Sequence, residues 1–186
     1  GMEVFTNTPK VIESRKMTLE MLLSVHNKSC LTCKRSGTCE LQALCQELGV
    51  EDSTSYEGAM PDSLYDDSTY HLVRDNSKCI LCRRCVAACA DPHVAVIGPN
   101  SRGFDTHIGC MFEQPLANVA CVSCGQCIVA CPTGALTEKD QCADVLAVLN
   151  DPTKYVVVQT APSIRATLGE CFGMPVGTNV DGKMVA

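Results

Sequence analysis

Apolar residues recur at steps of three and four between residues 8 and 26, and this spacing predicts an amphipathic helix. Thr8 is a residue type that caps helix N-termini, and Pro9 fits the first helical position. The predicted buried face carries Ile12, Leu19, Leu22, Leu23 and His26. We therefore expect His26 at the end of the helix, on its buried side.

The same patterning predicts three more helices and one buried strand. A short helix over Glu40–Leu48 can end at Gly49, and residues 140–150 carry apolar side chains on one helical face. Residues 155–159 read Tyr-Val-Val-Val-Gln and predict a buried strand, and residues 163–171 predict a helix after it.

A C-x2-C-x2-C-x3-C motif occurs twice and is the clearest organisational feature of the chain. The two runs are Cys79, Cys82, Cys85 and Cys89, then Cys121, Cys124, Cys127 and Cys131, with Pro132 directly after the second. A short apolar segment follows each run, at residues 94–97 and 135–136, and residues 102–109 between the runs are predicted as strand or loop. Two similar halves predict a pseudo-symmetric pair.

These elements indicate an α+β fold in four parts. Residues 1–50 form a helical module with a His/Cys group, residues 51–70 an exposed acidic connector, and residues 71–139 the repeat domain. Residues 140–186 contain the first βα unit of a further domain. A buried strand needs neighbours that this chain does not obviously supply, so we expect a fragment of a larger protein.

Composition restricts the possible functions. The chain has 186 residues, 15 of them cysteine, no Trp and a formal net charge of −6. It has neither a long apolar run nor a basic stripe, so we expect no membrane and no nucleic acid as partner. Its first residues lack a secretory signal, which indicates a soluble, cytoplasmic protein. In a reducing cytoplasm, closely spaced cysteines indicate metal binding rather than disulfides.

The two cysteine runs are typical of proteins that hold two [4Fe-4S] clusters. Three thiolates at three-residue steps wrap one side of a cluster, and the fourth cysteine of each run ligates the other cluster. The expected ligand sets are Cys79, Cys82, Cys85 and Cys131 for one cluster, and Cys121, Cys124, Cys127 and Cys89 for the other. Zinc is the alternative, but zinc sites usually combine two C-x2-C pairs and leave the third cysteine of such a run without a role.

A second kind of group combines His26, Cys30, Cys33 and Cys39. It fits a Cys3His zinc site or a third [4Fe-4S] cluster with one imidazole ligand. With the third cluster, eleven cysteines and one histidine supply four ligands to each of three clusters. We predict Cys142 and Cys171 as small buried side chains, no ligand role for Cys45 and Cys110, and a solvated position for His71, His93 and His107.

These residues resemble the accessory-cluster region of [FeFe]-hydrogenases. The resemblance rests on the His26 to Cys39 motif with Glu-Leu-Gln after it, on both cysteine runs, and on Thr-Ala-Pro-Ser-Ile-Arg at 160–165 and Gly-Lys-Met-Val at 182–185. It covers essentially the whole chain and is strongest for the large catalytic subunit of multimeric, NAD(P)-linked, electron-bifurcating enzymes. The large iron–sulfur subunit of NADH dehydrogenase and the alpha subunit of NAD-dependent formate dehydrogenase share the cysteine part.

The resemblance implies that the chain relays single electrons as part of a hydrogenase. Its three [4Fe-4S] clusters would connect an NAD(P)H-, flavin- or ferredoxin-linked partner to the hydrogen-activating H-cluster. It further implies a [2Fe-2S] domain before Gly1 and H-cluster ligands beyond Ala186, so no residue of this chain is expected to be catalytic and the chain alone is expected to be inactive. The implied partners are the rest of the catalytic subunit, flavin- and NAD(P)-binding subunits, small iron–sulfur subunits and ferredoxin. The alternative is the same relay in an NADH or formate dehydrogenase.

Overall fold

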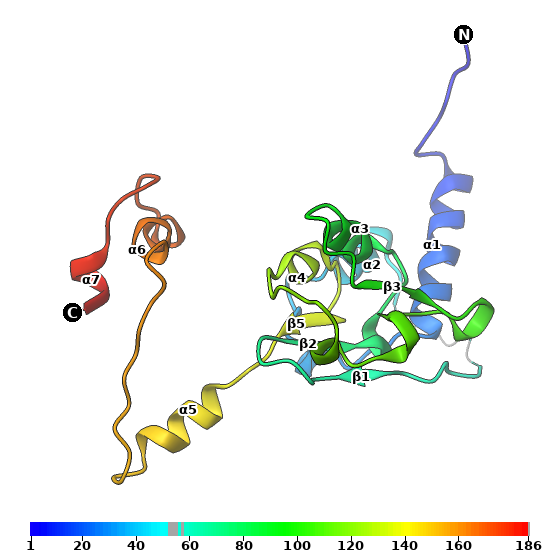
Figure 1. Ribbon diagram of the computed structural model, residues 1–186. Coiled ribbons are helices and arrows are strands. Elements are labelled where there is room, and N and C mark those ends of the chain that lie inside the picture. Colours follow the sequence, from blue (N-terminus) through cyan, green and yellow to red (C-terminus); the bar gives the residue numbers. More distant parts are fainter. Residues whose placement is uncertain (52–55, 57, 186) are drawn as a thin grey trace. The chain divides into compact units, whose positions relative to one another are not determined.

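The computed structural model describes residues 1–51, 56 and 58–185. The chain divides into two compact units, Gly1–Lys139 and Asp140–Ala186. Helices and small antiparallel sheets combine in the first unit, as expected for an α+β fold, and only helices are seen in the described part of the second (Figure 1). None of the described helices is both long and apolar enough to cross a bilayer.

Two helices begin the first unit, where the sequence predicts them. Helix α1 spans Pro9–Ser24, and the Thr8 hydroxyl accepts a hydrogen bond from a backbone N–H of its first turn. Helix α2 spans Glu40–Leu48 and ends at Gly49, whose φ of 61° lies in the left-handed region that glycine adopts most easily. A short 3-10 helix, Cys30–Thr32, lies between the two helices.

The two halves of the repeat exchange strands. Strand β2 (Leu72–Asp75) precedes the first cysteine run and pairs with β5 (Leu136–Glu138), which follows the second run. Strand β3 (Ile97–Asn100) follows the first run and pairs with β4 (His107–Cys110), which precedes the second. All of these pairs are antiparallel. The arrangement is the pseudo-symmetric pair that the repeated motif predicts.

Each cysteine run leads into a short helix with the same backbone geometry. Helix α3 spans Arg84–Ala90 and helix α4 spans Gln126–Ala130, and the two lie against each other (Figure 1). Leu81 and Ser123, equivalent in the two runs, have φ values of 55° and 56°. The residues before the helices, Arg83 and Gly125, are also left-handed, with φ of 60° and 73°. Three of these four positions hold side chains that disfavour this conformation, so the loops are held in a strained shape.

The interpretation of residues 51–70 as an exposed connector is wrong at its C-terminal end. Strand β1 (Tyr65–Asp66) pairs with β2 at the edge of the sheet, and Thr69 is buried. The Asp66 carboxylate lies 3.1 Å from the Arg74 guanidinium in a buried ion pair. The ion pair with Arg74 on strand β2 explains why this acidic segment packs against the domain. Residues 52–55 and 57 of the predicted connector lie outside the described part.

The described part of the second unit contains three α-helices but not the predicted strand. Helix α5 spans Cys142–Leu149, α6 spans Ile164–Thr167 and is continued by a 3-10 helix over Leu168–Phe172, and α7 spans Asp181–Val185. Residues 155–159 form no strand, and Tyr155 and Val158 are 94% and 84% exposed. A strand needs a ladder partner, and none is offered to this segment in the described part of the chain. The helix predicted over 163–171 is present but broken.

Cys142 and Cys171 contradict the expectation that they are buried, because both are exposed. The buried cysteine outside the two runs is Cys110, at the end of β4, which is 1% exposed. The core around it includes Leu72, Ile97, Ile108, Leu116, Ile128 and Leu136. The same core also contains Cys85, Cys89 and Cys131, three of the predicted cluster ligands.

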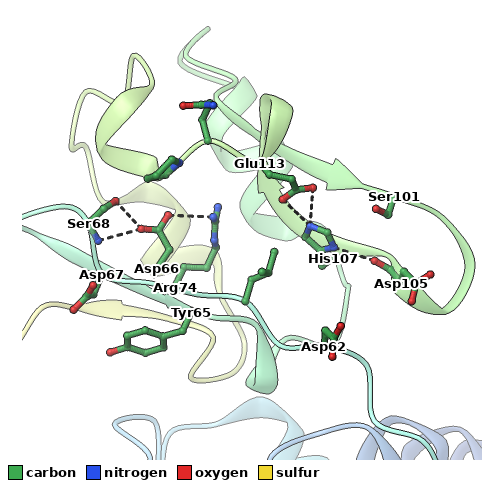
Figure 2. A pocket seen from close by; sticks show the side chains of 13 residues that line it. Asp62, Tyr65, Asp66, Asp67, Ser68, Arg74, Ser101, Asp105, His107 and Glu113 are labelled. Atoms are coloured by element: carbon green, nitrogen blue, oxygen red, sulfur yellow. Dashed lines mark hydrogen bonds and ion pairs between the residues drawn. The ribbon is translucent and has the colours of Figure 1, made fainter.

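His107 is not the solvated side chain that the sequence predicts, because it pairs with Glu113 (Figure 2). Burial alone would lower the pKa of His107, but hydrogen bonds to the Asp105 carbonyl and the Glu113 carboxylate outweigh burial and raise it. The same contact with His107 lowers the pKa of Glu113.

A raised histidine pKa stabilises the fold below the unfolded-state value of 6.5, and this stabilisation disappears as the pH rises through the folded-state value. We expect His107→Gln to reduce the free energy of unfolding by about 0.5 kcal/mol at about pH 5.5, a small effect because Glu113 is half exposed and water screens the pair. At about pH 8.5 the variant should match the parent chain in chemical denaturation. Equal losses at both pH values would contradict the ion pair.

Candidate iron–sulfur sites

The structure brings one predicted ligand set together around a single cavity. Cys79 and Cys82 come from the first loop, Cys85 from helix α3, and Cys131 from the residue after helix α4. All four thiols line the same cavity. The loop also directs an N–H toward sulfur, since the Leu81 amide donates a hydrogen bond of 3.4 Å to the Cys79 thiol.

The second predicted set lines a separate cavity with the same construction. Cys121 and Cys124 come from the second loop, Cys127 from helix α4, and Cys89 from the last turn of helix α3. The fourth cysteine of each run thus faces the three leading cysteines of the other run. The packing of α3 against α4 explains this exchange, because each helix carries its last cysteine across to the partner loop.

The electrostatics of these thiols fit a cationic group. Burial, followed by the charges of Cys79, Cys131 and Cys82, raises the pKa of Cys85 to about 12. Burial and the neighbouring Cys121 and Cys89 raise the pKa of Cys127 to about 11. Four thiolates in one place repel one another unless metal neutralises them, and thiolate ligands select iron–sulfur clusters or zinc. Among the described residues, no three His, Cys, Asp or Glu side chains are placed to hold a single metal ion.

The third predicted set is only partly gathered. His26, Cys30 and Cys39 line one cavity of about 210 Å³ between helices α1 and α2. Burial and the charge of Lys78 lower the pKa of His26, so its ring stays neutral, the form that binds metals. The Nδ1 atom of His26 is buried and has no hydrogen-bond partner in the described part of the chain, which fits a ligand position.

Two cysteines near this cavity differ from the prediction. Cys45 lines it, although its spacing in the sequence indicated no ligand role, and burial together with Cys39 raises its pKa. Cys33 does not line it, and its sulfur lies instead against Gly134 of the repeat domain. The helical step from Leu41 to Cys45 could have indicated this, since both face α1 across the same cavity.

Gly134 is expected to be essential for the position of Cys33. A Cβ added at Gly134 would lie 2.5 Å from the Cys33 sulfur, closer than atoms can approach. Gly134→Ala should therefore displace the Cys33 sulfur and, because Cys33 belongs to the predicted third ligand set, lower the iron content of the reconstituted chain. Gly98→Ala is the matched control, because a Cβ there meets nothing within 4 Å. Iron analysis of both reconstituted variants tests this, and full iron content in Gly134→Ala would contradict it.

Hydrogen bonds join the N-terminal module to the repeat domain at several places. The Asn27 amide donates to the Ser77 carbonyl at 2.8 Å, and the Glu40 amide donates to the Pro132 carbonyl at 3.0 Å. The Arg35 guanidinium donates to the Ile128 carbonyl at 2.7 Å. These bonds fix the His26 cavity beside the domain that carries both cysteine runs.

Two more side chains near the thiols were missed by sequence reasoning. His71 lies 3.2 Å from the Ser123 hydroxyl and 4.0 Å from the Cys121 sulfur, not on a solvated face. Arg74 is 5% exposed and lines both cysteine cavities. A single cation in an alternating strand pattern gives no signal of such a position, because it depends on how the two halves pack. His93 is exposed, as predicted.

A further cavity of about 590 Å³ is lined by no cysteine, although Arg74 borders it as well as both cysteine cavities (Figure 2). Its lining is mainly acidic and includes Asp62, Asp66, Asp67, Asp105 and Glu113, with Arg74 and His107 as the only basic residues. Asp66 and Glu113 are engaged with those two residues, so much of the charge is compensated internally.

Two family models match parts of the chain. The NADH-ubiquinone oxidoreductase-G iron-sulfur binding region matches residues 15–54, which contain the His26 group. The 4Fe-4S binding domain matches residues 119–137, which contain the second cysteine run. Both matches support iron–sulfur clusters of the [4Fe-4S] type.

Known proteins similar to the chain are oxidoreductases. It is 44% identical to the NADP-reducing hydrogenase subunit HndD of Solidesulfovibrio fructosivorans, over 100% of this chain and 32% of that protein. It is 37% identical to iron hydrogenase 1 of Clostridium pasteurianum, over 99% and 32%. Identity to the NADH-ubiquinone oxidoreductase 75 kDa subunit of Acanthamoeba castellanii is 33%, over 75% and 20%.

A solved structure, that of an NAD+-reducing [NiFe]-hydrogenase in the H2-reduced state, matches with a TM-score of 0.70 and 28% identity, over 75% of this chain and 59% of that one. The chain spans about a third of the length of the two hydrogenases that match it in sequence. The resemblance that the cysteine motifs indicate is thereby confirmed: the chain carries iron–sulfur binding regions and is similar over essentially its whole length to an NADP-reducing hydrogenase subunit and to an iron hydrogenase.

Proposed function

We propose that the chain relays single electrons through three [4Fe-4S] clusters. Two clusters take four cysteines each, and the third takes one histidine and three cysteines. The proposed ligand sets are Cys79, Cys82, Cys85 and Cys131; Cys121, Cys124, Cys127 and Cys89; and His26, Cys30, Cys33 and Cys39.

The exchange of the fourth cysteine between the two runs is the observation that carries the proposal. Two cavities, each lined by three cysteines of one run and one of the other, match the way two-cluster proteins distribute their ligands. A bound [4Fe-4S] cluster would supply a one-electron redox centre at each cavity. The left-handed loop residues also support cluster binding. Strained backbone of this kind persists only where surrounding contacts hold it in place, and it is common at ligand-binding sites.

Short separations between the sites suit a relay, because electron tunnelling falls steeply with distance. The Cys85 thiol of one set is close enough to Cys127 of the other for the charge of Cys127 to contribute to its raised pKa. The Cys33 sulfur lies against Gly134, three residues after Cys131. The two sets of the repeat domain therefore lie near each other, and Cys33 of the third set lies beside the segment that follows Cys131.

We place this relay in an NAD(P)-linked hydrogenase. It would connect a flavin-, NAD(P)H- or ferredoxin-linked partner to a hydrogen-activating cluster, and the 186 residues themselves would not turn over hydrogen. The same relay in an NADH dehydrogenase is the second candidate. The hydrogenase matches favour the first, because they extend over the whole chain whereas the match to the NADH-ubiquinone oxidoreductase protein covers 75% of it.

A potentiometric titration followed by electron paramagnetic resonance tests the relay. We expect the reconstituted chain to take up about three electrons, one for each cluster. His26→Cys should lower the reduction potential of one cluster, because a thiolate replaces a neutral imidazole and makes that site more negative. The potentials of the other two clusters should not move.

His93→Asn is the control, because His93 is exposed and left-handed and asparagine tolerates that backbone. It should leave all three potentials unchanged. A His26→Cys chain whose three potentials equal those of the parent would contradict the ligand role of His26, and uptake of only one electron would contradict the relay.

A further inference from the structure

The side chain of Arg74 borders both cysteine cavities of the repeat domain. It lies in strand β2, is 5% exposed, and lines both the cavity of Cys79 and the cavity of Cys121. Among the described residues no other cationic side chain lines both cavities, since His71 lines only that of Cys121 and Arg83 only that of Cys79. A guanidinium group stays charged at any physiological pH.

The hydrogen-bond donors of this buried guanidinium are only partly matched by acceptors. One terminal nitrogen donates to the Asp66 carboxylate at 3.1 Å, and the other reaches the Cys110 sulfur at 3.7 Å (Figure 2 shows the Asp66 contact). The Nε atom is buried and has no hydrogen-bond partner in the described part of the chain. A buried donor without an acceptor is costly, so its retention beside two sets of thiols needs an explanation.

Asp66 does not neutralise Arg74 completely. Its carboxylate also accepts hydrogen bonds from the Ser68 hydroxyl at 2.6 Å and from the Leu116 amide at 2.9 Å. Asp66 lines neither cysteine cavity, whereas Arg74 lines both. Within this ion pair Arg74 is therefore the partner that borders the thiols, while both residues also border the acidic cavity.

We propose that Arg74 is a shared electrostatic positioning residue that raises the reduction potentials of both clusters held by the two cysteine runs. The inference rests on the proposed function, since it needs a cluster in each cavity. Reduction adds a negative charge to a cluster that four thiolates already make anionic, and a buried cation beside it stabilises the reduced state. The Nε–H of Arg74 is available to a sulfur acceptor, a bond that also favours the more negative state.

Replacing Arg74 by glutamine tests the proposal through potentials, not through activity. Arg74→Gln should lower the equilibrium constant for reduction of both clusters about tenfold, which is about 59 mV for a one-electron couple. The cluster of His26 should not shift, because Arg74 does not line that cavity. Arg74→Lys keeps the charge but not the planar guanidinium, so its potentials should lie much closer to those of the parent chain than the potentials of Arg74→Gln do.

Arg84→Gln is the matched control. Arg84 is a cation near Cys82 and Cys131, but its side chain is 53% exposed and it pairs with Glu40, so water screens its charge. The variant should change the reduction equilibrium less than about twofold.

Asp66→Asn separates an electrostatic role from a merely structural one. It breaks the same ion pair but leaves Arg74 in place with its charge less compensated, so both potentials should rise, opposite in sign to Arg74→Gln. If Arg74→Gln does not assemble clusters, the potentials of Asp66→Asn and Arg74→Lys still test the electrostatic role of Arg74. Unchanged potentials in Asp66→Asn, or shifts of the same sign in Asp66→Asn and Arg74→Gln, would overturn the proposal.

Iron and sulfide analysis accompanies each titration. A parent chain without clusters would overturn the proposed function itself. Full clusters in every variant with unmoved potentials would overturn only the role of Arg74.

Discussion

Removal of iron from the assembled chain is expected to unfold most of residues 26–45 and 75–135. These segments contain the cysteine loops, and three predicted ligands, Cys85, Cys89 and Cys131, are members of the core itself. Without metal the Cys85 thiol is protonated, because burial and the charges of neighbouring cysteines raise its pKa to about 12. Structural metal sites supply about 10 kcal/mol or more of folding free energy, comparable to the whole stability of a domain.

Strain in the loops adds to this dependence on metal. Leu81, Arg83 and Ser123 are held in left-handed backbone, at a cost on the order of 1–3 kcal/mol each. Circular dichroism and amide hydrogen exchange before and after complete chelation measure the effect. Helix α1, with its capped N-terminus, should lose less protection than α3 and α4, which carry ligands. Native-like spectra and unchanged exchange in α3 and α4 after chelation would refute the prediction.

Substitution of the fourth cysteine of each run is expected to remove the cluster of the other run. Cys131→Ala should lose the cluster of Cys79, Cys82 and Cys85, and the iron content should fall from about 12 to about 8 per chain. Cys89→Ala should instead lose the cluster of Cys121, Cys124 and Cys127. Iron and sulfide analysis measures the loss, and paramagnetic resonance identifies which signal disappears.

Cys171→Ala is the matched control for these substitutions, since Cys171 is exposed and outside every cysteine cavity. It should retain all of the iron. Loss in Cys131→Ala of the signal that Cys124→Ala also removes would show that each run serves its own cluster, and the exchanged ligand sets would then be wrong.

Local chemistry made part of this fold predictable. The cap at Thr8, the stop at Gly49 and the duplicated cysteine spacing act within a few residues. The helices predicted over 8–26 and 40–48 are confirmed, and the two halves of the repeat pair as predicted. Spacing also predicted which cysteines share a cavity in the repeat domain, because ligands on short loops leave few arrangements.

The remainder depends on contacts between distant segments. Asp66 belongs to the domain because it meets Arg74, and Cys33 lies away from the His26 cavity because it packs against Gly134. Neither contact can be predicted from the pattern of hydrophobic and polar residues near it in the sequence. The predicted strand at 155–159 failed for the related reason that an apolar run becomes a strand only beside a partner.

X-ray diffraction data collected at the iron absorption edge test the central claim most directly. Anomalous difference density from crystals of the reconstituted chain should show three compact four-iron peaks, one in the cavity of Cys79, one in that of Cys121, and one beside His26. Single zinc ions at these places, or any of the three sites without iron, would contradict the account.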